Sequence, residues 1–94
     1  MRRIPKSFQL MGHTINVQVI DKKDWKIEDA SGYFDPDKNQ ILLLKQPRTQ
    51  LRHTYWHEVT HAILYVMGHK LYGNESFVDQ VGGLLAQIMD TAEF

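Results

Sequence analysis

The spacing of apolar residues changes at Pro47, and this change constrains the fold more than any other feature of the chain. Before Pro47, apolar and polar residues alternate over residues 7–20, and short β-like runs follow at 31–34 and 40–45. After it, apolar residues recur every three or four positions, over 49–67 and again from 74 towards 91. A period of two is typical of strands, and a period near 3.6 of amphipathic helices. The sequence therefore predicts an α+β fold, in which a small antiparallel sheet of two N-terminal hairpins packs on two helices.

A chain of 94 residues is predicted to form a single domain, with a β-rich half at 1–46 and a helical half at 47–94. Domains of this size bury only about 60% of the surface of the unfolded chain, and many of them rely on a disulfide or a metal for stability. The chain has no cysteine, which excludes a disulfide, a thiol nucleophile and a cysteine-ligated metal. A metal site would have to use His, Asp or Glu.

Local signals set the limits of the predicted elements. Asp35-Pro36-Asp37-Lys38-Asn39 suits the turn of the second hairpin. Gly68 is placed to end the first helix in a left-handed conformation, and Asn74 to cap the start of the second. The stripe of the second helix that we expect to be buried consists of Phe77, Val81, Leu84, Leu85 and Ile88. Its other face, which should pack closely against something functional, carries Glu75, Asp79, Gly82 and Ala86.

Charge and hydropathy exclude several kinds of partner. Eleven basic residues balance eleven acidic ones, so there is no net positive field to favour nucleic acid or anionic lipid. The basic start Met1-Arg2-Arg3 is followed by Ile4-Pro5-Lys6 rather than by an apolar run, which does not indicate a signal peptide. No segment approaches the roughly 18 apolar residues of a membrane span. We expect a cytoplasmic protein with no membrane or nucleic-acid partner; the oligomeric state stays open.

The stretch His57-Glu58-Val59-Thr60-His61 is an HExxH pattern inside the first predicted helix. Histidines four residues apart lie about 40° apart around a helix axis and roughly 6 Å apart along it, so both rings can reach one metal ion. Glu58 lies about 60° from His61 in projection. It can face a water molecule on the metal without binding the metal, as a general base must. The pattern predicts a zinc site held by His57 and His61, with Glu58 as the catalytic residue.

Zinc in a catalytic site needs a third protein ligand. The longer HExxHxxGxxH pattern fails, because Leu64 and Met67 stand where it requires Gly and His, and a deformylase site would need a cysteine. The remaining candidates are His53, His69, Glu75 and Asp79. His53 is expected to face solvent one turn before the pair. His69, beyond the helix end, is expected at the surface or at the C-terminal dipole of the helix.

The segment from Asn74 to Asp79 resembles the NExxxD element of gluzincin metallopeptidases, whose Glu is the third zinc ligand and whose Asp supports a zinc-bound His. The short length, the hairpins and the two final helices resemble the minigluzincins, and more loosely the ImmA/IrrE-like peptidases of phages and mobile elements. The resemblance implies that Glu75 binds zinc and that Asp79 supports a ligand. A ligating His also generally donates its other N–H to a carboxylate or carbonyl, so Asp79 should accept from His57 or His61. Close approach of the two helices would explain Gly82 within a helix.

The function expected from these residues is that of a zinc-dependent peptidase, an endopeptidase acting on a peptide or protein. Glu58 would take a proton from water activated by zinc and return it to the leaving amine. Tyr65, Tyr72 and His69 are open alternatives as the partner of the oxyanion. The strand 41–44 would bind substrate as a sheet edge, or be an ordinary interior strand. Two other functions stay open: a non-catalytic zinc-stabilised module that binds a partner, and a regulatory peptidase that cuts a repressor or antitoxin.

Overall fold

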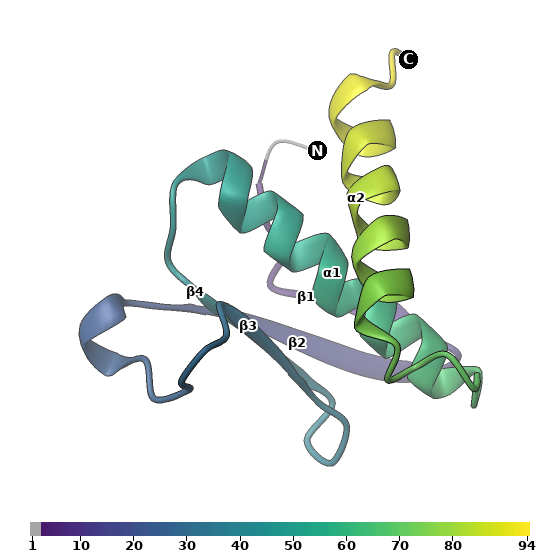
Figure 1. The fold of residues 1–94 in the computed structure, drawn as a ribbon, viewed down its shortest axis with the longest axis horizontal. Helices are drawn as coiled ribbons and strands as arrows, with labels where there is room; N and C mark the ends of the chain where they lie inside the picture. The colour runs from purple at the N-terminus through teal and green to yellow at the C-terminus, as the bar shows by residue number, and fades with distance from the viewer. Residues whose placement is uncertain (1–2) are drawn as a thin grey trace.

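The computed structural model describes residues 3–94 and has the predicted α+β class: four strands followed by two α-helices (Figure 1). Met1 and Arg2, which belong to the basic start considered as a leader, lie outside the described residues. All four strands end before Pro47, and both α-helices follow it. The change in apolar spacing therefore marks the boundary between sheet and helices.

Both predicted hairpins are confirmed. Strands β1 (Ser7–Leu10) and β2 (His13–Ile20) pair antiparallel around a turn in which Met11 and Gly12 have positive φ angles of 48° and 83°. Strands β3 (Gly32–Asp35) and β4 (Gln40–Leu44) also pair antiparallel. The carboxylate of Asp35 accepts a hydrogen bond of 3.0 Å from the backbone N–H of Asp37, which closes the second turn.

The ladder between the two hairpins is parallel, so the sheet is mixed and not antiparallel throughout as predicted. The strand order is β1-β2-β4-β3, with β2 and β4 running in the same direction. Of the two alternatives left open for 41–44, the structure shows the interior strand and rules out the substrate-binding edge strand, because β4 lies between β2 and β3. Its continuous apolar run fits that place, since Ile41 and Leu43 are completely buried. The edge strand on this side is β3.

Helix α1 (Arg48–Val66) packs across the sheet and closes the core. Its bounds differ from the predicted ones by one residue at each end, and Gly68 follows with the expected positive φ of 64°. The core joins apolar side chains of β2, β3 and β4 to those of α1: Ile15, Phe34, Ile41, Leu43, Tyr55, Val59 and Ala62. Within residues 3–94, no helix is both long and apolar enough to cross a bilayer.

Helix α2 (Glu75–Thr91) begins as predicted, with the side chain of Asn74 accepting a 3.0 Å hydrogen bond from the N–H of Phe77. It packs on α1, and its C-terminal turns extend away from the sheet (Figure 1). The stripe predicted to be buried is wrong, since Leu84 and Ile88 are 59% and 57% exposed. The buried residues of α2 are Val78, Gly82 and Ala86. Small side chains allow the helices to approach closely, so the face chosen by helix packing is not the most apolar one.

Candidate metal centre

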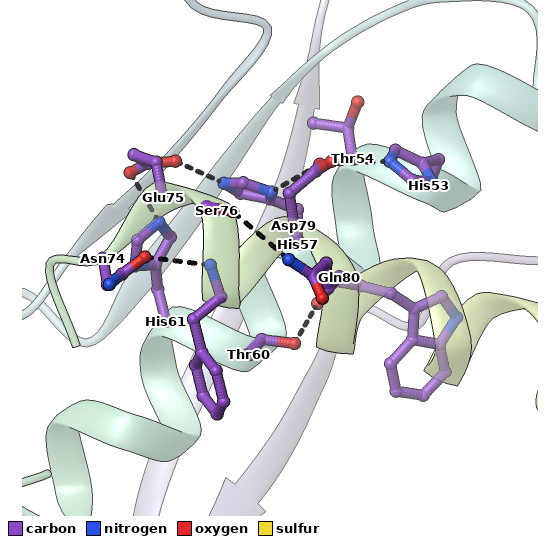
Figure 2. Close-up of polar contacts among 12 residues, drawn as sticks. His53, Thr54, His57, Thr60, His61, Asn74, Glu75, Ser76, Asp79 and Gln80 are labelled. Carbon is purple, nitrogen blue, oxygen red and sulfur yellow. Dashed lines mark hydrogen bonds and ion pairs between the residues drawn. The ribbon is translucent and has the colours of Figure 1, made fainter. Parts of the chain in front are cut away.

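Helices α1 and α2 bring His57, His61 and Glu75 together (Figure 2). The two histidines lie one turn apart on α1, and Glu75 is the first residue of α2. Nε2 of His57 lies 3.0 Å from Oε2 of Glu75, and Nε2 of His61 lies 3.1 Å from Oε1. One ligand atom from each of the three residues falls within 4.8 Å of the other two. This arrangement matches the ligand set that the sequence predicted.

Each histidine ring also has an acceptor at its other nitrogen. Nδ1 of His57 lies 3.3 Å from Oδ1 of Asp79, and Nδ1 of His61 lies 3.0 Å from the backbone carbonyl oxygen of Tyr72. Asp79 thus stands where it was expected, beside His57. Sequence reasoning missed the contribution of Tyr72, because a backbone carbonyl carries no residue-specific signal. If Nδ1 of each ring donates to its acceptor, the lone pair of Nε2 is free to bind a metal.

The donor set fits a divalent metal. If each Nδ1 donates to its acceptor, Nε2 of the same ring could also donate to Glu75 only if the whole ring were a doubly protonated imidazolium cation. The centroids of the two rings are only 5.0 Å apart. Two adjacent cations would repel each other, whereas a metal ion between two neutral rings and a carboxylate satisfies all three. Nε2 of His57 and Nε2 of His61 lie beside different oxygens of Glu75, and one ligand atom from each of the three residues falls within 4.8 Å of the other two.

The helix pair is as close as the glycine in α2 suggested. A β-carbon added at Gly82 would lie 2.9 Å from Cα and 3.0 Å from N of His57, and 3.1 Å from the carbonyl oxygen of Trp56. Unbonded carbon atoms normally stay about 3.5–4.0 Å apart. No larger residue fits at this crossing without moving a backbone. Gly82 therefore sets the distance between the helix that carries the histidines and the helix that carries Glu75.

The two other histidines that the sequence offered as ligands lie outside this group. His53 is exposed, and its Nε2 lies 3.4 Å from Oδ1 of Asp79, whose carboxylate stands between the rings of His53 and His57 (Figure 2). Nδ1 of His69 accepts a 3.0 Å hydrogen bond from the N–H of Leu71, and its ring stacks on Phe77. His69 is thus held away from the pair, as the sequence predicted.

Glu58 lies beside the three candidate ligands without belonging to them. Its side chain is buried, and burial raises its pKa to about 7; the nearby Glu75 also raises it, while His57 and a hydrogen bond from the backbone N–H of Phe34 lower it. A carboxyl group is costly to bury unless something uses it or satisfies it. Phe34 lies on β3, so the edge strand contacts the side chain for which a catalytic role was predicted.

A cleft of about 710 Å³ lies between β3 with its preceding loop on one side and the two helices on the other. Glu75 is 70% exposed at its rim, whereas the side chains of His57 and His61 are only 18% and 12% exposed. A group bound there would thus be held by protein on the histidine side and be reachable from solvent on the other. Besides the three candidate ligands, the lining of the cleft includes Gly32, Tyr33 and Phe34 of β3, Thr54 and Glu58 of α1, and Tyr72.

Comparison of the chain with models of protein families, with curated proteins and with solved structures gave no match. Its function must therefore be inferred from the residues of this site.

Proposed function

We propose that the protein is a zinc-dependent peptidase that hydrolyses peptide bonds, with Glu58 as the general base. One observation carries the proposal: His57, His61 and Glu75 converge on one point, while the buried carboxyl of Glu58 lies beside them without being a ligand. Three protein ligands leave a fourth position for water or substrate, which distinguishes a catalytic zinc site from a structural one. The proposal includes the gluzincin type, since the third ligand is a glutamate.

The residues around the site divide into holding and orienting roles. His57, His61 and Glu75 would hold the ion, and zinc in such a site supplies a more acidic water and polarises a carbonyl group. Asp79 and the carbonyl of Tyr72 fix the two rings by accepting from their Nδ1 atoms. Both acceptors lie outside the ligand set, so their loss should weaken metal binding without abolishing it.

Glu58 would take the proton from the attacking water and later give it to the leaving amine. Both transfers require a carboxyl group that changes protonation near neutral pH, and burial places the pKa of Glu58 in that range in the metal-free protein. A nearby cation favours the carboxylate form, so a bound metal would lower this pKa and provide the base. These two opposing effects suit a group that must both accept and release a proton.

Tyr72 is the best placed of the three side chains considered for the oxyanion. It lines the cleft, and its ring centroid lies 5.5 Å from that of His61. Burial raises the pKa of Tyr72, with further contributions from Tyr33, Tyr65, Glu58 and Glu75, so the phenol keeps its proton. A donor aimed at the carbonyl oxygen would stabilise the charge that develops there. His69 is already engaged with Leu71.

We place an extended peptide substrate along the free edge of β3, in place of the strand 41–44 chosen from the sequence. The N–H of Leu44 bonds to the carbonyl of Ser31 at 2.9 Å, so Ser31 and Tyr33 direct their backbone groups towards β4. Gly32 then directs both of its backbone groups to the open side, and Phe34 directs its carbonyl there, while the N–H of Phe34 bonds to Glu58. A peptide could pair with the free groups. A peptidase without cysteine needs no oxidising compartment, and the proposal keeps the cytoplasm as its location.

The competing function, a zinc-stabilised binding module without catalysis, accounts less well for Glu58. Such a module would gain from a fourth protein ligand and would have no use for a buried carboxyl that binds nothing. The burial of Glu58 therefore favours the enzyme.

The test combines metal analysis with hydrolysis. Purified protein should contain one zinc per chain by elemental analysis and should cleave an unfolded protein or a quenched peptide library. Glu58→Gln should keep its zinc and lose cleavage, because the amide removes the base and leaves the ligands intact. Zinc-loaded parent that cleaves no substrate, or Glu58→Gln that cleaves like the parent, would refute the proposal. A parent that binds no zinc would refute it as well.

A further inference from the structure

The edge strand β3 comes unusually close to α1 at the residue proposed as the base. A β-carbon added at Gly32 would lie 2.6 Å from Cγ2 of Thr54, and 3.0 Å from both Cγ and Oε2 of Glu58. Unbonded carbon atoms normally stay about 3.5–4.0 Å apart. The strand therefore reaches this position only because residue 32 has no side chain. A glycine inside a strand is otherwise unfavourable.

Two further contacts hold the strand at this distance. The N–H of Phe34 donates to the carboxylate of Glu58, two residues along β3 from Gly32. At the start of the strand, Oε1 of Gln46 accepts from Thr54 at 3.3 Å, and Nε2 of the same amide donates to Ser31 at 3.4 Å. Strand β3 thus acts on Glu58 in two ways. The N–H of Phe34 bonds to its carboxylate, and the backbone at Gly32 limits where its side chain can go.

We propose that Gly32 is a positioning residue for Glu58: the bare backbone of β3 at this point sets where the carboxylate stands relative to the bound water. The catalytic consequence rests on the proposed peptidase function. The contact itself does not, since it is present without metal or substrate. All three candidate ligands lie on α1 and α2, so a change at residue 32 should act on the base and leave the metal in place.

The alternative is that Gly32 only permits packing of the sheet on α1. The shortest contact of the added carbon is with Thr54, not with Glu58, so a methyl group at position 32 could act by pushing the whole strand outward. Thr54→Ser removes the Cγ2 atom that makes this contact and keeps the hydroxyl bonded to Gln46. Combining it with Gly32→Ala leaves the contact with Glu58 as the close one.

The first experiment measures steady-state hydrolysis and zinc affinity. Gly32→Ala should lower kcat by roughly 10–100-fold, since a displacement of about 1 Å is enough to misplace a catalytic group. The zinc Kd should stay close to that of the parent, because all three candidate ligands lie outside β3. Gly32→Ala/Thr54→Ser should remain as slow as Gly32→Ala. Gly83→Ala is the matched control, because Gly83 lies on α2 outside the lining of the cleft and a methyl there would meet only Cε1 of His53, at an ordinary 3.4 Å. Parent-like kcat in Gly32→Ala, or full recovery in the double variant, would overturn the proposal.

The second experiment needs no activity and uses thermal unfolding of the metal-free protein. Gly32→Ala should lower Tm by about 5–10 °C in the parent, the expected effect of forcing a methyl group into a packed contact. With Thr54→Ser present in both backgrounds to remove the closer clash, the same change should cost less than half as much when Glu58→Ala removes the crowded Cγ and carboxylate. Equal losses in both backgrounds would show that Gly32 does not act through Glu58. If the parent cleaves nothing, the peptidase function falls, and this cycle alone decides whether Gly32 holds Glu58.

Discussion

Gly82→Ala tests whether helix packing and metal binding depend on the same distance. The added methyl carbon would lie 2.9 Å from Cα of His57, whereas ordinary carbon contacts are about 3.5–4.0 Å, so α2 must retreat by roughly 0.6–1 Å. Glu75 lies seven residues before Gly82 on the same helix and should move with it. Metal–ligand distances tolerate only about 0.2 Å. Zinc affinity should therefore fall, by about 10–100-fold if the loss resembles that of a misplaced supporting residue.

The stability effect of the same substitution has two opposing parts. Alanine stabilises a helix by about 1 kcal/mol relative to glycine, while overpacking costs about 1–3 kcal/mol. The sum is a loss of up to about 2 kcal/mol, or a drop in Tm of up to about 16 °C for a domain of this size. Zinc titration and thermal unfolding of the metal-free protein measure the two effects. Gly83→Ala is the control, because its methyl would approach only Cε1 of His53, at an ordinary 3.4 Å. A Gly82→Ala protein with parental zinc affinity and a raised Tm would refute the reasoning.

Three further predictions follow from the geometry of the site. Glu75→Ala should weaken zinc binding more than Asp79→Ala does, and His69→Ala should leave zinc binding unchanged. Competition with a chromophoric chelator measures the three affinities, and a larger loss in His69→Ala than in Glu75→Ala would contradict the ligand assignment. Because burial raises the pKa of Glu58 to about 7 from an ordinary 4.5, its contribution to metal-free stability is full below pH 4.5 and lost towards pH 7. The free energy of unfolding of metal-free Glu58→Gln should therefore rise relative to that of the parent, by up to about 3 kcal/mol from pH 4.5 to pH 8. Urea unfolding in the presence of a chelator measures this difference. A difference between the two proteins that does not change with pH would argue against a buried, protonated Glu58. Tyr72→Phe should lower kcat about 100-fold and keep its zinc, whereas an unchanged kcat would remove the phenol from the mechanism.

Sequence reasoning predicted the elements and the histidine pair because both depend on local spacing within one helix. Glu75 was expected as the third ligand from the resemblance to the NExxxD element, since spacing alone left several candidates. The order of strands could not be derived in this way. Both hairpins were clear, but the side on which they join depends on the packing of α1, which turns β4 inward and leaves β3 at the edge. Sequence reasoning missed Gly32, because a glycine at the start of a strand does not tell which element comes close to it.

The error on α2 has a different cause. The apolar period pointed to Phe77, Val81, Leu84, Leu85 and Ile88 as the buried stripe, since a helix usually turns its most apolar side inward. In this chain the approach to α1 requires small residues, and the side that carries Glu75 and Asp79 must face the histidines. Both requirements are met when the side of α2 that carries Val78, Gly82 and Ala86 packs on α1, and these are its buried residues. Leu84 and Ile88 are left exposed on the flank.

The edge position of β3 has a consequence for how the proposed peptidase activity should be lost on heating. A strand with only one neighbour opens at a lower cost than strands paired on both sides, and such local opening precedes global unfolding. Opening of β3 would release Glu58 from Phe34 and remove one wall of the cleft, whereas His57, His61, Glu75 and both of their acceptors lie within residues 57–79. Hydrolysis should then cease over a range of temperature in which the metal is still bound.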